Sequence, residues 1–227
     1  MNLPHLHPWP ATFPEARALQ ESLARRVRLR PPRSAPRLIA GADVSYTRGD
    51  ARFFAAVVLW DADARETVET ATNVGESPFP YVPGYLSFRE LPTLLDAFRR
   101  LGRTPDCVMF DGQGIAHPRR FGLACHGGMV LGLPSLGVAK TRLVGEHKAP
   151  GAKAGAWTPL VDKGETVGAA LRTRKGVKPV FVSPGDRMDL ETAIALTLRC
   201  CAGRRIPEPT RLAHIAVNAL RREVQGA

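Results

Sequence analysis

The pattern of apolar and polar positions predicts a chain that alternates short strands with helices. Apolar runs or apolar–polar alternation, both typical of strands, occupy residues 38–46, 53–60, 66–74, 107–110, 135–139, 166–174 and 179–183. Helical spacing and helix-end signals predict helices over residues 14–29, 119–131, 189–201 and 210–224, and another that ends near residues 101–102. The second and third strands are expected to run antiparallel beside the first. This order predicts an α/β fold with a mixed sheet flanked by helices.

Proline and arginine residues over 30–36 interrupt the chain between the first predicted helix and the first strand. We therefore predict an N-terminal helical extension with a Pro/Arg linker over residues 1–36, and a single domain over residues 37–227. The apolar runs are too short to cross a bilayer, and the first ten residues do not have the pattern of a signal peptide. Four cysteines without C-x-x-C spacing indicate reduced thiols in a cytosolic protein.

The charge balance narrows the range of partners. Lys and Arg outnumber Asp and Glu by 32 to 21, which gives a formal net charge of +11 at pH 7. Such a surplus favours a polyanionic partner such as nucleic acid, and no membrane partner is expected. An arginine-rich composition from a GC-biased genome would give the same balance.

Two aspartates are candidates for chemistry because each lies in or directly after an apolar strand. Asp43 lies inside the run 38–44, and Asp111 follows the run 107–110. A carboxylate in such a place is unfavourable unless it is paired or binds a metal. If the two strands are adjacent, the carboxylates meet at their carboxyl ends and repel each other unless a cation such as Mg²⁺ lies between them. The alternative is that each aspartate caps a local turn.

Three more residues are candidates for the same site. Ser87 and Glu90 have the spacing of a capping box, but Pro92 would then be the fifth helical residue, so a helix start at Pro92 would leave Glu90 free. Lys140 ends a predicted strand and would lie beside a phosphate or simply extend into solvent. His214 falls outside the apolar stripe of its helix, which suits a cleft or solvent. That stripe is predicted to be Leu212, Ile215, Ala216 and Ala219.

Other segments suggest contacts with a nucleic acid. The segment from Pro80 to Pro83 is a stiff turn that presents Tyr81, which would wedge between bases or pack on its own loop. His117 and Arg119 belong to a small basic cluster that would hold phosphates, unless it is a solvated helix start. Glycines that would let a backbone approach a ligand are Gly112, Gly114 and Gly122.

Five ordered segments together resemble the endonuclease V family of deoxyinosine-directed repair nucleases. The segments are GADVSY (41–46), PYVPGYLSFRELP (80–92), DGQGIAHPRRFGLACH (111–126), GVAK (137–140) and PTRLAH (209–214). The resemblance therefore extends over most of the chain, although no motif matches the first thirty residues or the loop 145–155. It implies a ribonuclease H-like fold, and it favours functional roles for Glu90, Tyr81, Lys140 and His214.

The resemblance also implies roles for single residues. Asp43, Glu90 and Asp111 would be metal ligands, and Lys140 and His214 would complete the catalytic site. Tyr81, in its turn between Pro80 and Pro83, would separate the strands. The pocket for the flipped hypoxanthine would be lined by Leu86, Gly112, Gly122 and Leu123.

The implied reaction is Mg²⁺-dependent hydrolysis of the second phosphodiester on the 3′ side of deoxyinosine, leaving 3′-hydroxyl and 5′-phosphate ends. Mn²⁺ is expected to substitute for Mg²⁺. The implied partner is DNA containing deoxyinosine, with inosine-containing RNA as a further candidate, and the protein is expected to be a cytoplasmic monomer. The rivals are another nuclease of the same fold, such as a junction resolvase or a ribonuclease acting on inosine RNA, and a non-catalytic nucleic-acid-binding module with structural carboxylates.

Overall fold

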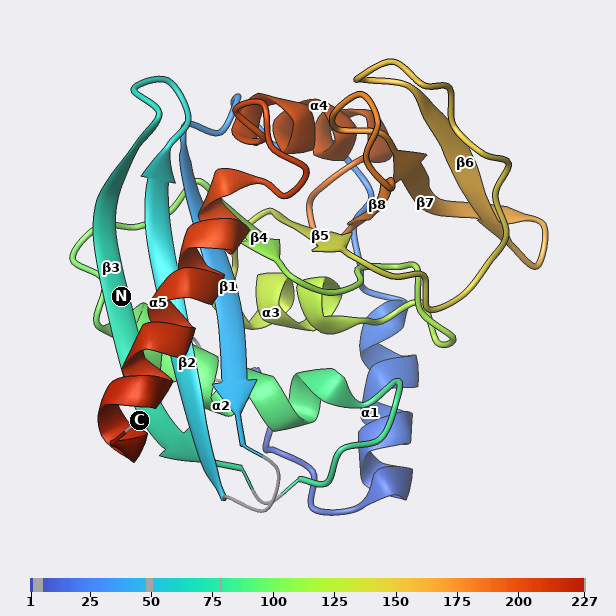
Figure 1. Cartoon of the computed structure of the whole chain (residues 1–227). Helices are drawn as coiled ribbons and strands as arrows, with labels where there is room; N and C mark the ends of the chain where they lie inside the picture. Colours follow the sequence, from blue (N-terminus) through green and yellow to red (C-terminus); the bar gives the residue numbers. More distant parts are fainter. Residues whose placement is uncertain (2–5, 48–50, 78, 227) are drawn as a thin grey trace.

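The computed structural model describes residue 1 and residues 6–47, 51–77 and 79–226. Within these ranges, helices cover both faces of an eight-stranded mixed sheet (Figure 1), which confirms the predicted fold class. The strands are β1 (Leu38–Tyr46), β2 (Arg52–Asp61), β3 (Glu66–Glu76), β4 (Cys107–Phe110), β5 (Ser135–Ala139), β6 (Trp157–Asp162), β7 (Glu165–Leu171) and β8 (Val180–Pro184). The helices are α1 (Phe13–Ala24), α2 (Leu86–Arg99), α3 (Leu123–Leu131), α4 (Leu190–Cys200) and α5 (Glu208–Gln225). None of these helices is both long and apolar enough to cross a membrane.

The strands follow the spatial order β3-β2-β1-β4-β5-β8-β7-β6. β1 pairs antiparallel with β2 on one side and parallel with β4 on the other. β3 pairs with β2 and not with β1, so the expectation that both following strands flank the first is wrong for β3. The edge strand β6 was not predicted, because it contains Pro159 and buries only Leu160 fully, which leaves no clear apolar pattern.

Two helices have bounds that differ from the prediction. α1 ends at Ala24 and not at residue 29. The carboxylate of Asp186 accepts hydrogen bonds from the backbone N–H and the guanidinium of Arg28, each at 3.0 Å, and so holds this segment outside the helix. α3 begins at Leu123 and not at residue 119, because Gly122 is extended and forms the N-cap.

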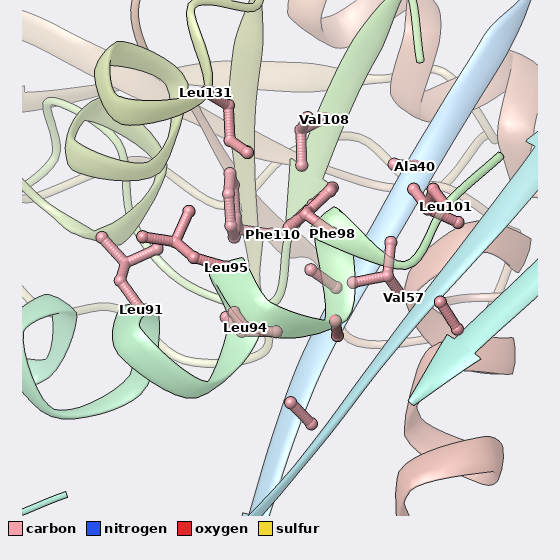
Figure 2. Packing of buried hydrophobic residues seen from close by; sticks show 14 of the residues in the cluster. Ala40, Val57, Leu91, Leu94, Leu95, Phe98, Leu101, Val108, Phe110 and Leu131 are labelled. Carbon is pink, nitrogen blue, oxygen red and sulfur yellow. The ribbon is translucent and has the colours of Figure 1, made fainter. Parts of the chain in front are cut away.

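α2 begins at Leu86 and continues through Pro92, so the predicted helix start at Pro92 is wrong. The capping box is also absent, since Tyr85 is the N-cap and no side chain caps it. Proline has no N–H and removes one intrahelical hydrogen bond, which disfavours such a position. Apolar packing on the sheet compensates, and Figure 2 shows the side chains of α2 facing those of β4, α3 and the sheet. The labelled members of this cluster include Leu91, Leu94, Leu95, Phe98, Val108, Phe110 and Leu131.

α5 crosses β1 on the opposite face of the sheet (Figure 1). The approach is close at Gly41, where a Cβ would lie 2.0 Å from the carbonyl carbon of Pro209. Glycine is therefore required at this crossing. Because Asp43 lies two residues further along β1, its side chain is on the same face as α5.

The stripe of α5 that faces the sheet differs from the prediction. Ala213 and Val217 are buried, whereas Ile215 is 50% exposed and Ala219 is also exposed. The contact between Pro209 and Gly41 sets this rotation of the helix. As a result, the exposed side chain of His214 lies next to the buried face and can reach β1.

Candidate active site at the carboxyl ends of β1 and β4

Asp43 and Asp111 lie side by side at one edge of the sheet. The parallel pairing of β1 with β4 sets Ala42 opposite Phe110, and the next residue of each segment is an aspartate. Neighbouring strands are about 4.8 Å apart, so the two carboxyl groups interact directly. The predicted adjacency of these two strands is confirmed.

The carboxyl groups at this edge disfavour one another's charge. Burial, and then the charge of Asp111, raise the pKa of Asp43 above its usual value. Glu90, a half-buried residue in the second turn of α2, has its pKa raised to about 8 by burial and then by the charges of Asp43 and Asp111. α2 therefore brings Glu90 to the two strand ends. Three carboxyl groups share a region in which they cannot all be ionised at neutral pH without a cation.

Two basic side chains contact the aspartates. Lys140 follows β5, which is parallel to β4, and its ammonium forms an ion pair with Asp111. Nδ1 of His214 lies 2.7 Å from Oδ2 of Asp43. When the carboxylate is ionised, Nδ1–H donates this hydrogen bond, and Nε2, which lies 3.3 Å from the amide nitrogen of Asn218, is the acceptor of the ring. Both side chains reach solvent, and both are positioned by a carboxylate.

The donor set suits a hard divalent cation. Carboxylate oxygens that leave room for water are the ligands that Mg²⁺ prefers. The raised pKa values of Asp43 and Glu90 reflect an excess of negative charge that a cation would balance. Within the described ranges, no three His, Cys, Asp or Glu side chains are drawn together tightly enough to enclose an ion. The residues fit a divalent ion in chemistry and charge, although two of the carboxylates are engaged by Lys140 and His214.

A cavity of about 420 Å³ opens beside Asp111 and Lys140. Tyr81 lies at its rim with 57% of its surface exposed, so much of the ring is open to a partner. Pro80 and Arg119 do not line the cavity. The predicted substrate-binding residues that do line it are Tyr81, Pro83, Leu86, Gly112, His117, Gly122 and Leu123.

Backbone atoms pack closely around this cavity. A Cβ at Gly122 would lie 2.4 Å from the carbonyl oxygen of Gln113, and one at Gly137 would lie 2.3 Å from that of Gly112. Side chains are therefore excluded at both positions. The backbone N–H and C=O groups of this wall are of the kind that recognise the polar edge of a planar ligand.

His117 and Arg119 stabilise the cavity wall through hydrogen bonds to its backbone. His117 is 3% exposed, and its Nδ1 accepts a hydrogen bond of 3.2 Å from the backbone N–H of Arg119. Its Nε2 therefore carries the proton and donates to the carbonyl oxygen of Gly84 at 3.0 Å. Burial and the nearby charge of Arg119 lower the pKa of His117 to about 4. The alternative of a solvated helix start is wrong, and the neutral ring of His117 offers no positive charge to a phosphate.

Sequence reasoning missed residues on two sides of the cavity. Gln20 of α1 lines it, as do Thr141, Arg142 and Leu143 after β5. Gln20 carried a weak signal, because it is a polar residue at helical spacing from the buried residues Ala16 and Leu23. The segment 141–143 carried none, since it lies outside every helix and strand.

Comparisons with known proteins agree with this geometry. A model of the endonuclease V family matches residues 21–215. Endonuclease V of Myxococcus xanthus is 50% identical over 223 residues, covering 96% of this chain and 94% of that protein. The crystal structure of endonuclease V from Streptomyces avermitilis has a TM-score of 0.92 and 47% identity over 96% of both chains.

A more distant structure shows the same fold with a bound nucleic acid. Endonuclease V from Ciona intestinalis, in complex with DNA containing an inosine followed by a ribo-adenosine, has a TM-score of 0.82. It is 26% identical and covers 93% of this chain and 98% of that chain. The match of the family model over most of the chain, the high identity to curated relatives and the shared fold show that this chain belongs to the endonuclease V family, which has the ribonuclease H-like fold.

Proposed function

We propose that this endonuclease recognises deoxyinosine in DNA and hydrolyses the second phosphodiester bond on its 3′ side, leaving 3′-hydroxyl and 5′-phosphate ends, as a step of DNA repair. The observation that carries the proposal is that the cavity and the carboxylate cluster share Asp111 and are both bordered by Lys140. A base held in the cavity would place its own strand at the carboxylates. The inosine-containing DNA bound to the Ciona intestinalis relative supports the choice of base.

The cofactor in this proposal is Mg²⁺, for which Mn²⁺ would substitute. Asp43, Glu90 and Asp111 would hold it, since their carboxyl groups share one region and their mutual repulsion favours a cation. When bound, the ion would polarise the phosphate and lower the pKa of the attacking water. Binding would also return Glu90 to its ionised form at neutral pH, because the ion would offset the charges that raise its pKa.

Lys140 and His214 would act on different parts of the reaction, Lys140 on the phosphate and His214 on the attacking water. The ammonium of Lys140 would move from Asp111 to the phosphoryl oxygens and offset the charge that develops there. His214, oriented through Nδ1 by Asp43, would hold the attacking water with Nε2. Asp43 thereby acts as a metal ligand and fixes the orientation of the imidazole.

Recognition takes place at the cavity. Tyr81, exposed on a turn between two prolines, would fill the space that the flipped nucleotide leaves in the duplex. The flipped hypoxanthine would lie against Leu86, Leu123 and the glycine-rich backbone at Gly112 and Gly122. Unstacking is easier for a poorly paired inosine than for a normal base, and this difference adds to the selectivity.

The net charge of +11 would add sequence-independent affinity for DNA, which weakens as salt rises. In this proposal the protein acts in the cytoplasm. It acts as a monomer, because one chain supplies the cavity and all five catalytic side chains. Inosine-containing RNA is a second candidate substrate, favoured by the ribo-adenosine that follows inosine in the bound Ciona intestinalis oligomer.

A nicking assay with Mg²⁺ tests the proposal on matched oligomers. The substrates are inosine-containing DNA, the same sequence with adenine, inosine-containing RNA, an RNA–DNA hybrid and a four-way junction. We expect cleavage of the inosine-containing DNA on the 3′ side of the lesion, and no cleavage when EDTA removes the metal. Preferential cutting of the junction or of inosine RNA would replace the proposed substrate with that one.

The catalytic role of the carboxylates is tested with Asp111→Asn. We expect lost cleavage and retained binding to inosine-containing DNA, because the substitution keeps the shape of the site and removes a metal ligand. Asp96→Asn, an exposed carboxylate of α2 outside the site, serves as the matched control and should cleave normally. Undiminished Mg²⁺-dependent nicking by Asp111→Asn would contradict the catalytic role of Asp111, whereas the absence of cleavage by the wild-type protein would support the non-catalytic binding module.

A further inference from the structure

The turn that presents Tyr81 is fixed at its end by the carbonyl oxygen of Gly84. Three side chains direct donors at this one oxygen: Nε2 of Gln20 at 3.0 Å, Nε2 of His117 at 3.0 Å and Nη2 of Arg119 at 2.7 Å. Gly84 has a φ of +85°, and a Cβ there would lie 3.0 Å from the guanidinium of Arg119. The chain is therefore locked in a conformation that only glycine adopts without strain.

Gln20 is the member of this group that comes from α1. It is 1% exposed, and both ends of its amide are engaged. Nε2 also donates to the carbonyl oxygen of Phe121 at 3.3 Å, and Oε1 accepts from Nε of Arg119 at 2.6 Å. Since Phe121 also lines the cavity, just before the start of α3, Gln20 joins the tyrosine turn to another part of the cavity wall.

α1 also packs against the residues on either side of the tyrosine turn through apolar side chains. Ala16 is buried in a cluster with Phe79 and Phe88. The ring of Phe13 lies 5.3 Å from the ring of Phe79 and 5.3 Å from that of Tyr85, so it spans both ends of the turn. Figure 1 shows α1 beside the connection between β3 and α2. The helix thus contacts this segment through polar and apolar groups together.

We propose that Gln20 is a positioning residue for Tyr81, and that α1 is part of the apparatus that recognises the substrate. The proposal rests on the proposed role of Tyr81 as the residue that replaces the flipped base. A tyrosine that enters a duplex works against base stacking, and a loosely held turn would yield instead of the DNA. Gln20, Arg119 and His117 supply that resistance through Gly84.

If Gln20 had a purely structural role, its removal would lower stability and leave recognition of the lesion unchanged. The cavity is lined by Gln20 and by Tyr81, Pro83 and Gly84 of the turn, so the amide acts where the base would enter. It makes no contact with the carboxylates at the ends of β1 and β4. Its removal should therefore weaken recognition of the lesion and leave the chemical step intact.

The test compares Gln20→Leu with wild type on inosine-containing duplex DNA. Leucine keeps a similar volume and removes both the donor and the acceptor. We expect KM to rise about fivefold to tenfold, the effect of one or two lost buried hydrogen bonds, while kcat changes by less than about twofold. The preference for inosine over adenine should fall in parallel. Hydrogen exchange in metal-free protein should speed up at residues 81–85, a readout independent of cleavage.

Two further variants separate positioning from folding. Gln20→Glu keeps the acceptor for Arg119 but sets an oxygen against the carbonyl of Gly84, so it should raise KM even where Gln20→Leu folds poorly. Leu196→Ala, in α4, removes buried packing in a cluster that contains no residue of the cavity or of the turn, and it should lower stability with KM unchanged.

A double substitution decides whether Gln20 acts through Tyr81. In a Tyr81→Ala background, Gln20→Leu should have no further effect on KM or on lesion preference, because coupled residues are not additive. Full additivity, or an unchanged KM in Gln20→Leu, would overturn the inference while leaving the proposed function in place. If Tyr81→Ala itself leaves the preference for inosine unchanged, the proposed role of Tyr81 is wrong and the inference fails with it.

Discussion

The strand ends that carry Asp43 and Asp111 differ from the segment around Gly84 in how their polar groups are balanced. At the strand ends, like charges are held together, and the pKa values of Asp43 and Glu90 rise as a consequence. Around Gly84, three donors converge on one acceptor, and the polar groups are satisfied within the protein. On the proposed mechanism a cation would balance the charges of the first region, whereas the polar groups of the second region are satisfied within the protein.

This difference separates the contribution of each region to stability from its contribution to activity. A group of crowded carboxylates destabilises the metal-free fold, so removing one should lower activity and raise stability. A buried acceptor with its donors stabilises the fold, so removing a donor should lower both. Substitutions in the two regions therefore test the comparison directly.

The largest effect is expected for Asp43→Asn. Cleavage of inosine-containing DNA should fall about 10³-fold or more, because the substitution removes a metal ligand and the partner that orients His214. In EDTA, the melting temperature should rise relative to wild type, since one of three mutually repelling carboxylates is gone. A fall in melting temperature without metal would contradict the description of the strand ends as destabilising.

A smaller effect is expected for Arg119→Leu at the other region. It removes the hydrogen bonds to Gly84 and Gln20 and the stacking of the guanidinium 4.3 Å from the ring of Tyr85. The free energy of unfolding should fall by about 1–3 kcal/mol, measured by urea denaturation, and cleavage should weaken mainly through KM. Arg17→Leu, an exposed arginine of α1 paired with Glu21, is the control and should change neither quantity much.

The smallest effect is a pH dependence that identifies Glu90 as the titrating group. Its pKa is about 8 in the metal-free fold and near 4.5 when the chain is unfolded. Between these values the folded state retains a proton that the unfolded state loses, so its contribution to stability falls as pH rises from about 4.5 to about 8. Glu90→Gln should make the metal-free protein less sensitive to this rise, because glutamine has no proton to lose at this position.

Denaturation in EDTA at pH 6 and pH 8.5 measures this difference between wild type and Glu90→Gln. Adding Mg²⁺ at pH 8.5 should restore the stability of wild type and have little effect on the variant. Equal pH dependence in the two proteins would show that Glu90 is not held beside the two aspartates in its protonated form.

Sequence alone predicted the charged region well. Asp43 and Asp111 were visible because a carboxylate in or directly after an apolar strand is rare without a partner. The parallel pairing that brings them together was an inference from strand order, and the structure confirms it. Glu90 was harder, since local rules placed the helix start at Pro92, whereas apolar packing of α2 carries the helix through the proline.

The region around Gly84 was largely hidden from sequence reasoning. Its hydrogen bonds to Gly84 join residues 33 to 64 positions apart, and each uses a neutral or surface-type side chain that has many ordinary roles. No local pattern distinguishes a glutamine that holds a distant carbonyl from one that faces solvent. The edge strand β6 escaped for a related reason, because its pairing with β7 and not its own composition defines it.

The close crossing of α5 over β1 at Gly41 has a consequence for the order in which activity is acquired. His214 reaches Asp43 only when this last helix has docked, and Pro209 must first fit against a position without a side chain. On the proposed mechanism, a molecule whose α5 has not yet docked on β1 would already hold its acidic residues and be unable to cut. Docking of α5 would therefore be the step that turns a folded sheet with its carboxylates into a complete catalytic site.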